Sequence, residues 1–516
     1  MKQIIVFVFF LTTCIGFSQT KENRQTSLVE INSQKTKNNT VTAVTYQIDQ
    51  KHYVYSGGDG PFVDAFSMNS KGVLNSVGTY ELSHKKGPAR GMVADRIQGS
   101  DYLFVGNKGG DAVEVFKIEK DGSLQRVFVV KDTAETHLGV VITLKVIHIK
   151  KSSYLFVGGL ERETPGLSCF KIHADGKLTH VQSMKDTDEI HTDGIIGMYA
   201  HQIKGKTFLF TGGFQDNGIS SFRVYANGRF KAINSISDNT VDRYLTGTYP
   251  VDGVTLGNHH YVVVGHRHHK YYKRATGWIK NTNFVYHGDG VSVFKVTNKG
   301  ELVPHSVLVN NEQTKLAGQT RIEILKVNND EAVVAIATRD DESIQLCTLN
   351  KDGILIPTGF LETGYPIYYG MASQKIGQDL FFLAGSVDNS VKNLFSYKVN
   401  VNEKESKTLE TKVLRHVVNL KYIETATTEE IDNAVEGFKA LQNKIPEILD
   451  FEWGINISKE GHSKGFTHCF FVTFKDEASR DIYLNHKDHL ALVAKVGPLL
   501  ADVLVMDYWT KISLKE

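Results

Sequence analysis

The stretch VFKIEKDGSL, residues 115–124, contains the phrase that decides the fold: Phe116 is followed six positions later by Gly122 and then by apolar Leu124. Seven copies of this phrase run along the chain. Their anchors are Phe66, Phe116, Phe170, Phe222, Phe294, Cys347 and Tyr397. The sixth copy has a cysteine in the aromatic slot, and the seventh has lost its glycine. Successive anchors lie 50, 54, 52, 72, 53 and 50 residues apart.

A period of roughly 50 residues with several short strands per unit is typical of a β-propeller, so seven copies predict seven blades. Within each unit an inner strand comes first, followed by a β-branched and aromatic run ending in glycine, such as YLFVGN. The Phe-Lys strand is third, and a polar strand is fourth. We therefore predict a mostly β protein with a seven-bladed propeller over residues 39–400. The repeated aromatic and glycine positions are interpreted as packing and turn residues, so none of them is a candidate site residue.

The two ends of the propeller are less regular. Residues 20–38 are polar and patternless, which predicts a flexible leader. Residues 401–413 are charged and free of glycine, and they indicate a linker or a ring-closing strand. Two segments are alternatives for closing the seventh blade, residues 39–47 and residues 407–413.

Bulk composition narrows the function. The 59 basic and 57 acidic residues give a net charge of +2, so no overall field attracts nucleic acid or a membrane. Residues 1–19 have one lysine and a short apolar run, the pattern of a secretory signal. A lipoprotein signal at Cys14 is disfavoured because Thr13 precedes it. No later segment is apolar enough to span a bilayer. We expect an exported protein, periplasmic or secreted.

Three cysteines follow the signal, Cys169, Cys347 and Cys469, each in strand-like sequence of a different unit. An exported protein with three scattered cysteines has no disulfide framework to rely on. We expect its hydrophobic core to hold it together.

From residue 414 to 516 the pattern changes to β-α-β-β-α-β, which predicts a four-stranded antiparallel sheet with helices on one face, a small α+β ferredoxin-like barrel domain. Three motifs stand out in it: RHVV at 415–418, THCFFVTF at 467–474 and YLNHKDH at 483–489. With these motifs the segment resembles the Dabb family, the stress-responsive A/B barrels. The resemblance implies a homodimer formed through this domain. The repeats, for their part, resemble lactonase-type seven-bladed propellers.

The mouth of the propeller channel is the predicted ligand site, because the loops entering the inner strands and those between the second and third strands open on one face. The long gap of 72 residues falls in such a loop, residues 265–290. We assign His191 and Tyr244 to catalysis. The predicted substrate-binding residues are Arg90, His137, Arg243, His266, His268, His269, Lys273, Arg274, Tyr365 and Tyr368.

Cationic and aromatic side chains over a pocket favour an anionic substrate, since cations pair with anions and aromatic rings stack on sugars. A uronic acid or a sulfated sugar fits an exported protein. The alternatives are a solvated basic loop without ligand, and a divalent-metal site at His266–His269 completed by His191 or Asp193. No fixed metal-binding motif accompanies these histidines, so a metal cofactor stays open.

In the C-terminal domain His416, His468, Tyr483 and His489 match positions that resemble the pocket of catalytic Dabb members, which cyclise polyketides by proton transfer. The resemblance makes these four residues catalytic candidates. The alternative is a set of interior rings in a dimerisation module.

Three functions remain open. The first is a dehydratase or lyase that eliminates water or a glycosidic group from the non-reducing-end uronic acid of an anionic oligosaccharide. In its arrangement of domains the chain resembles the oligosaccharide dehydratases that act on algal ulvan. The second is a lactonase acting on a sugar lactone. The third is a non-catalytic glycan-binding scaffold dimerised by the Dabb domain.

Overall fold

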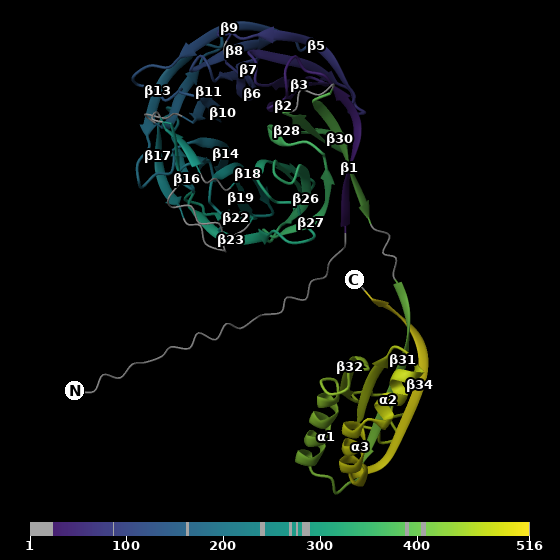
Figure 1. Ribbon diagram of the computed structural model, residues 1–516. Helices are drawn as coiled ribbons and strands as arrows, with labels where there is room; N and C mark the ends of the chain where they lie inside the picture. The colour runs from purple at the N-terminus through teal and green to yellow at the C-terminus, as the bar shows by residue number, and fades with distance from the viewer. Residues whose placement is uncertain are drawn as a thin grey trace, which may run out of the picture. The chain divides into compact units, whose positions relative to one another are not determined.

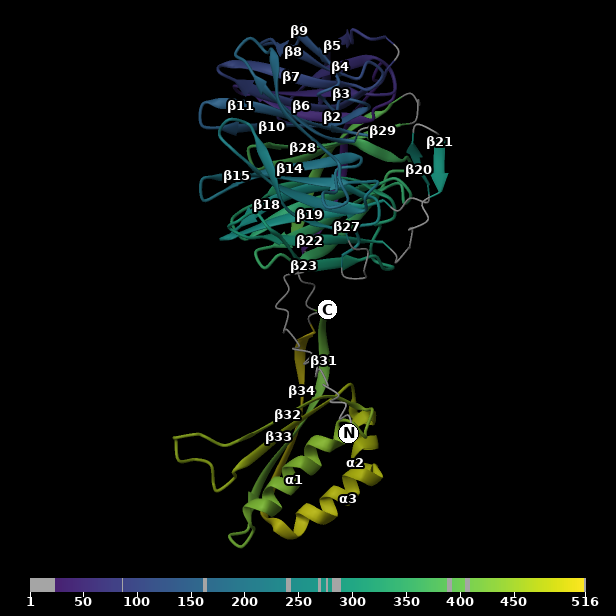
Figure 2. The same ribbon diagram turned by 90° about the vertical axis from the view of Figure 1, so that its left-hand side faces the viewer.

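The computed structural model describes residues 24–85, 87–160, 165–237, 243–267, 271–274, 277–280, 289–387, 392–403 and 409–514 (Figures 1 and 2). The chain divides into two compact units, residues 1–402 and 403–516. The predicted secretory signal, residues 1–19, lies outside the described residues. In the described ranges we find no helix with the length and apolar character needed to cross a membrane.

The described residues of the first unit form seven four-stranded antiparallel sheets and a separate two-stranded hairpin. We number the seven in chain order, and the first and the seventh are continuous with each other. Sheets 1 to 3 are β2 (Thr42–Ile48), β3 (Lys51–Gly57), β4 (Phe62–Met68) and β5 (Leu74–Glu81); β6 (Ala89–Ile97), β7 (Ser100–Asn107), β8 (Ala112–Ile118) and β9 (Leu124–Lys131); and β10 (Val141–Ile149), β11 (Ser152–Gly159), β12 (Gly166–Ile172) and β13 (Leu178–Lys185). Sheets 4 and 5 are β14 (Ile195–Ile203), β15 (Lys206–Gly213), β16 (Gly218–Val224) and β17 (Phe230–Ile236); and β18 (Thr248–Leu256), β19 (His259–His266), β22 (Gly290–Val296) and β23 (Leu302–Val309). Sheets 6 and 7 are β24 (Gln319–Lys326), β25 (Glu331–Thr338), β26 (Ser343–Asn350) and β27 (Leu355–Glu362); and β28 (Ile367–Ile376), β29 (Asp379–Ser386), β30 (Leu394–Glu403) and β1 (Arg24–Gln34).

The sheets lie around a common centre (Figure 1), in the manner of propeller blades. The first strand of each sheet contacts that of the next, in the order β2, β6, β10, β14, β18, β24 and β28, and β28 contacts β2 in turn. A parallel pairing of Thr42 with Tyr369 joins sheets 7 and 1. The four-stranded repeat predicted from the sequence is therefore present, and the fold is β-propeller-like.

The glycine of the repeated phrase has a physical reason. Gly122 has a φ of +85°, and a Cβ atom there would lie 2.3 Å from the ring of Tyr53 in the preceding sheet. Tyr53 also donates its hydroxyl to the carbonyl of Lys120, at 2.9 Å. A ring thus occupies the space that a side chain would need. The same pairing recurs at Gly176 with Tyr102, Gly228 with Tyr154, Gly300 with Phe208, Gly353 with Tyr261, and Gly72 with Phe381.

The Gly72–Phe381 pair connects sheet 1 with sheet 7, so the repeat unit continues from the last sheet to the first. Ser396 of sheet 7 supports the junction, because its hydroxyl donates to the carbonyl of Gly72 at 2.6 Å. The seventh phrase has no glycine, and the structure shows why. Its strand β30 does not turn back in a hairpin, since β1 supplies the next strand of the sheet.

The prediction of a flexible leader at residues 20–38 is wrong for β1, which pairs with β30 as the outermost strand of sheet 7. Leu28 is buried in the core of that sheet. Strand β30 would otherwise present an unpaired edge, which β1 covers. Both predicted closing segments are also wrong. Residues 42–48 form the inner strand of sheet 1, and residues 409–422 form the first strand of the second unit.

The second unit is a four-stranded antiparallel sheet, ordered β32-β33-β31-β34. Its elements are β31 (Leu409–Tyr422), α1 (Thr428–Leu441), β32 (Ile448–Ile455), β33 (His468–Phe474), α2 (Glu477–Asn485), α3 (Lys487–Val496), the short 3-10 helix η1 (Gly497–Leu499) and β34 (Leu500–Leu514). The predicted β-α-β-β-α-β order is confirmed, with two corrections. The final helix is divided at His486, whose ring caps α3, and the predicted linker 401–413 is shorter because β30 extends into it from one side and β31 from the other.

Candidate functional site

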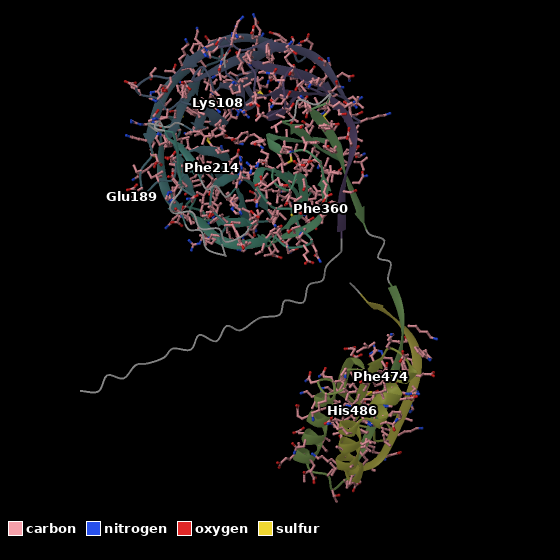
Figure 3. All side chains as sticks on the ribbon, viewed as in Figure 1. Lys108, Glu189, Phe214, Phe360, Phe474 and His486 are labelled. Carbon is pink, nitrogen blue, oxygen red and sulfur yellow. The ribbon has the colours of Figure 1, made fainter. Side chains whose placement is uncertain are left out.

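In the first unit, the starts of several inner strands meet at one cluster. Ile142, Ile196 and Tyr249 come from β10, β14 and β18 and are buried together, and Phe214 and Tyr369 pack against them. Figure 3 shows Phe214 towards the centre of the sheets, whereas Glu189 lies at their periphery. Four different sheets thus contribute to one apolar floor, as expected where the strands of a propeller converge.

A cationic and aromatic group lies against this floor, and we call it the arginine–tyrosine cluster: Arg90, Tyr249, Arg267, Tyr368 and Tyr369. The rings of Tyr249 and Tyr369 stack with centroids 5.3 Å apart and planes 9° apart. The guanidinium of Arg267 lies 5.6 Å from the ring centroid of Tyr249 and 5.5 Å from that of Tyr368. Arg90 forms an ion pair with Asp59.

Burial raises the pKa of Tyr249, while Arg267, its contact with Tyr369 and the more distant Arg90 act in the opposite direction. Burial raises the pKa of Tyr369 well above its ordinary value, and Tyr249 adds to that rise. Both phenols therefore hold their protons at neutral pH, and Tyr249 is the one that loses its proton more readily. Two stacked phenols beside two guanidiniums can receive an anion and exchange a proton with it.

Of the residues predicted at this rim, Arg90 and Tyr368 belong to the arginine–tyrosine cluster. Sequence reasoning missed Tyr249, Arg267 and Tyr369. Arg267 lies within the His266–His269 segment, whose pattern indicated histidine ligands and not an arginine. Tyr249 and Tyr369 follow the starts of inner strands in register with Arg90, and that register was the available signal.

His137, His191 and Tyr244 lie one per sheet at the same position of the repeat, and the structure does not bring them together. Each ring packs on the glycine that opens the third strand of its own sheet: a Cβ atom at Gly166, Gly218 or Gly290 would lie 2.7, 2.5 or 2.7 Å from these rings in turn. The backbone N–H groups of His137 and His191 donate to Ser168 and Ser220. These contacts fasten the loops that enter the sheets. Burial, and then Asp289, raise the pKa of Tyr244.

His266 is buried, at 1% exposure. Its Nδ1 donates to the carbonyl of Thr246 at 3.2 Å, and its Nε2 accepts from the N–H of Gly290 at 3.2 Å. Asp289 Oδ1 lies 3.8 Å from that Nε2. The two ring nitrogens are thus used within sheet 5.

The other predicted rim residues are spread out. Tyr365 shares a hydroxyl hydrogen bond of 2.9 Å with Tyr397 and stacks on Phe395 within sheet 7. Arg243 is half-buried in the loop before β18. Lys273 and Arg274 belong to β20 (Tyr271–Arg274), which pairs with β21 (Gly277–Lys280) in the two-stranded hairpin labelled in Figure 2. His268 and His269 lie outside the described residues.

Asp193, an alternative metal ligand beside His266, lies instead in a group with Asp186 and Asp216. One carboxylate oxygen of each of these three residues lies within 4.8 Å of the others, and in the described part of the chain this is the group of acidic, cysteine or histidine side chains close enough to share a metal ion. The N–H of Asp193 donates to Asp216 at 2.7 Å, and Thr192 donates to Asp186. Burial and the charge of Asp186 raise the pKa of Asp216 to about 8. The group therefore retains a proton and fastens the loop before β14.

The second unit brings three of its four predicted residues together. The ring centroid of Tyr483 lies 4.3 Å from that of His489 and 5.7 Å from that of His416. Tyr483 is fully buried, and its hydroxyl has no hydrogen-bond partner among the described residues. Burial lowers the pKa of His489, and burial raises that of Tyr483. Both rings are therefore neutral near pH 7.

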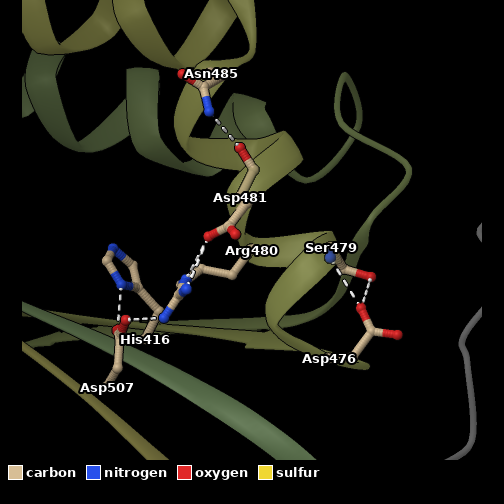
Figure 4. A network of polar contacts seen from close by, with 7 residues as sticks. All are labelled: His416, Asp476, Ser479, Arg480, Asp481, Asn485 and Asp507. Atoms are coloured by element: carbon tan, nitrogen blue, oxygen red, sulfur yellow. Dashed lines mark hydrogen bonds and ion pairs between the residues drawn. The ribbon is translucent and has the colours of Figure 1, made fainter.

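Charged residues orient this group from one side (Figure 4). His416 Nδ1 donates to Asp507 at 2.7 Å, and Arg480 donates to the other Asp507 oxygen at 2.8 Å and to Asp481 at 2.7 Å. Burial alone would raise the pKa of Asp507, but the bonds from His416 and Arg480 lower it overall. The aspartate fixes the orientation of the His416 ring.

His468 is not part of this group. It pairs with Leu420, whereas His416 pairs with Val472 four residues further along β33. At ~3.4 Å per residue this separates the two histidines by roughly 14 Å along the sheet. His468 packs instead against Tyr422 and Trp453. Burial lowers its pKa.

The sheet of the second unit exposes a row of large apolar side chains on its edge strands: Leu449, Trp453 and Ile455 on β32, and Val503, Leu504, Val505, Met506, Tyr508 and Trp509 on β34. Exposed apolar patches of this kind mark interaction surfaces.

Comparison with known proteins identifies the family of the second unit. Residues 414–510 match the model of the stress responsive A/B barrel domain, Dabb. The stress-response A/B barrel domain-containing protein HS1 of Arabidopsis thaliana is 30% identical over 102 residues, 20% of this chain and 94% of that protein. Olivetolic acid cyclase of Cannabis sativa is 24% identical over 95 residues, 18% of this chain and 94% of the cyclase.

Through these C-terminal residues the chain belongs to the stress-responsive A/B barrel family. Two solved structures are also similar. A dimeric ferredoxin-like protein from Jannaschia sp. CCS1 is 25% identical, with a TM-score of 0.18, and the match covers 19% of this chain and 97% of that one. A protein from Lactobacillus plantarum is 14% identical, with a TM-score of 0.44, over 66% of this chain and all of that one.

Proposed function

We propose that the protein is an exported carbohydrate-active enzyme that eliminates water from a uronic acid at the non-reducing end of an anionic oligosaccharide, such as a sulfated, ulvan-like one. In this proposal the seven sheets form a closed propeller of the lactonase type. Its mouth holds the substrate at the arginine–tyrosine cluster. The observation that carries the proposal is the stacked pair Tyr249 and Tyr369 beside Arg267 and Arg90.

The chemistry of the elimination matches these groups. Arg267 neutralises the uronate carboxylate, which makes the C5 proton more acidic. Tyr249 first releases its hydroxyl proton to water, and Arg267 favours the phenolate that results. This phenolate takes the C5 proton, and the C4–O bond breaks as the C4=C5 double bond forms. Tyr369 protonates the departing hydroxyl, which leaves as water. The apolar floor at Ile142 and Ile196 accommodates the less polar face of the sugar ring.

The roles predicted earlier for His191 and Tyr244 change under this proposal, because both rings pack on glycines of their own sheets. We propose that they position the loops around the mouth. The cationic residues of the excursion from 265 to 290 remain proposed contacts for the sulfate groups or further sugars of the substrate.

A second candidate places proton transfer in the second unit. The unpartnered hydroxyl of Tyr483, held against His489 and the Asp507-oriented His416, favours it. This group fits a neutral carbonyl substrate, because Arg480, the cation beside it, is engaged by two aspartates. A lactonase and a non-catalytic glycan-binding scaffold are further alternatives.

We also propose a homodimer formed through the second unit. The exposed apolar residues of β32 and β34 support it, and a large apolar patch of this kind is unusual on a monomer. Sedimentation of the wild-type protein beside Met506→Lys tests this. A dimer that dissociates in the variant is expected. A wild-type protein that is monomeric at all concentrations contradicts the proposal.

The elimination is tested with uronate-ended oligosaccharides, by the ultraviolet absorbance of the unsaturated product and by the loss of one water in mass spectrometry. Tyr369→Phe removes the acid and keeps the stack, so we expect turnover to fall while binding persists. Tyr365→Phe is the matched control, because it removes a hydroxyl of sheet 7 outside the cluster. A lactone panel scored by proton release distinguishes the lactonase, and binding without any new product indicates the scaffold.

A further inference from the structure

A second polar group lies at the opposite ends of the inner strands from the arginine–tyrosine cluster. His201 is near the end of β14, Thr255 is near the end of β18, and His260 is near the start of β19. Thr255 and His260 are direct partners across the β18–β19 hairpin. Sheets 4 and 5 therefore hold the three side chains in place by regular backbone pairing, and the proposed function does not use them.

Three donor atoms converge there. His201 Nε2 lies 3.0 Å from His260 Nδ1, and Thr255 Oγ1 lies 2.8 Å from the first and 2.7 Å from the second. In an octahedral ion with bonds of ~2.0–2.1 Å, neighbouring ligand atoms are separated by about 2.9 Å. The three measured separations match one face of such an octahedron. Without an ion the same atoms share hydrogen bonds.

The surroundings of the imidazoles also suit a metal. The hydroxyl of Tyr199 contacts the other nitrogen of His201, Nδ1, at 3.1 Å, and the two rings stack. Metal-binding histidines usually make such a second contact, which fixes the ring and its tautomer. Burial and the neighbouring His260 lower the pKa of His201 to about 4, and burial and His259 lower that of His260. Both rings are thus neutral, as a ligand must be.

Access from solvent is open, because His201, Thr255 and His260 are only half-buried. Water can therefore fill the remaining coordination positions. Imidazole nitrogen with a hydroxyl and water favours first-row dications such as Ni²⁺, Cu²⁺ and Zn²⁺ over Ca²⁺ or Mg²⁺.

We propose that His201, His260 and Thr255 form a binding site for one first-row transition-metal dication that joins sheets 4 and 5. The ion is exchangeable and structural, bridging a strand of one sheet to the hairpin of the next. It adds a cross-link where the two sheets otherwise meet by packing.

The test is titration of chelator-stripped full-length protein with ZnCl₂ and with NiCl₂, followed by calorimetry, together with thermal unfolding. We expect His201→Gln and His260→Gln each to weaken the tightest site by at least ~10-fold, the loss typical of perturbing a metal's ligand environment. Tyr199→Phe should weaken it less. Zn²⁺ should raise the unfolding temperature of the wild type and not of His260→Gln.

His259→Gln is the matched control. His259 directly precedes His260 in β19, and its ring is tilted against that of Tyr261 with centroids 6.2 Å apart, so it faces away from the three donors. We expect binding to be unchanged in this variant. Equal metal binding by the wild type and the double variant His201→Gln/His260→Gln, or no tight site in the wild type, would overturn the proposal. Circular dichroism of each variant establishes that the sheets have formed.

Discussion

The two units place tyrosine in opposite electrostatic settings. In the first, Tyr249 and Tyr369 lie beside Arg267 and Arg90, and the guanidinium of Arg267 lies over the rings of Tyr249 and Tyr368. In the second, Tyr483 is enclosed by the rings of His416, Phe474 and His489, and the nearby Arg480 is bound by Asp507 and Asp481. An anionic ligand is thus favoured in the first setting, and a neutral one in the second. Under the proposed function, the charge around the tyrosine decides which class of ligand each unit receives.

The largest expected effect separates these two settings. Arg267→Met should lower kcat/KM on a uronate-ended oligosaccharide by roughly 10²–10³-fold, since a preorganised charge opposite the reacting group is lost. Arg267→Lys should recover only part of it, because lysine does not reproduce the planar stack. Initial rates of product absorbance provide the measurement. Arg223→Met, which removes a similar stack over Phe208 and Tyr225, is the control. Equal losses in Arg267→Met and Arg223→Met would contradict the assignment.

Glycine-to-alanine substitutions compare the ring-on-glycine packing of the first unit with a glycine in the second unit that has no such contact. Gly228→Ala places a Cβ atom 2.3 Å from Tyr154 at a φ of +82°, so we expect a loss of about 2–4 kcal/mol in the free energy of unfolding. Gly205→Ala, with a φ of +72° and open space, should cost only about 1–2 kcal/mol. Gly454→Ala in β32 meets nothing within 4 Å and should be nearly neutral. Urea denaturation measures all three, and similar losses at Gly228 and Gly205 would show that the ring contact has little weight.

The units should also respond to pH with opposite signs. Asp216 in the first has its pKa raised to about 8, so the folded state keeps a proton that the unfolded chain releases above its ordinary pKa of 3.8. Its contribution to stability therefore falls as pH rises from 3.8 to about 8. Asp216→Asn should remove this dependence and gain on the order of 1–2 kcal/mol relative to wild type between pH 5 and 8. Urea denaturation of the wild type and of Asp216→Asn at pH 5 and at pH 8 measures this change. The same difference in the free energy of unfolding at both pH values would contradict the proton held by Asp216.

Asp507 in the second unit has a lowered pKa, so its contribution is complete above the ordinary value of 3.8 and is lost as pH falls through the folded pKa. Asp507→Asn should cost about 1 kcal/mol at neutral pH, since the carboxylate is partly exposed. The deficit should disappear in acid. A loss that persists below pH 3 would assign the effect to packing. Tryptophan fluorescence in a Trp278→Phe background, which keeps Trp453 and Trp509 of the second unit, follows the unfolding of this unit.

The fold could be predicted from sequence because its repeat is enforced at every junction. The glycine of each phrase meets a ring from the sheet before it, so a periodic contact leaves a periodic pattern. β1 escaped prediction because its partner, β30, is hundreds of residues away and its polar sequence shows little alternation. Long-range pairing of an isolated strand leaves no local signal.

The candidate site was only partly predictable for a related reason. Arg90 and Tyr368 were found because they enter inner strands, but the stack of Tyr249 on Tyr369 joins two sheets that are not neighbours in the chain. His137, His191 and Tyr244 were predicted as site residues because they lie in loops that enter inner strands. The structure shows that in sheets 3, 4 and 5 this position of the repeat holds a packing ring. In the second unit Tyr483 and His489 were predicted from the family resemblance. The resemblance also implied His468, which lies along another part of the sheet.

Because β1 pairs with β30, the first described strand of the first unit to be synthesised cannot pair until the last strand of that unit has been synthesised. Six sheets can form in sequence as the chain emerges, yet the seventh lacks a strand until its first and last segments meet. Contacts of such long sequence separation are slow to form. A short deletion or a bulky fusion next to Arg24 should therefore leave most sheets intact and prevent β1 from pairing with β30. We expect this loss to appear as early protease cleavage near sheet 7.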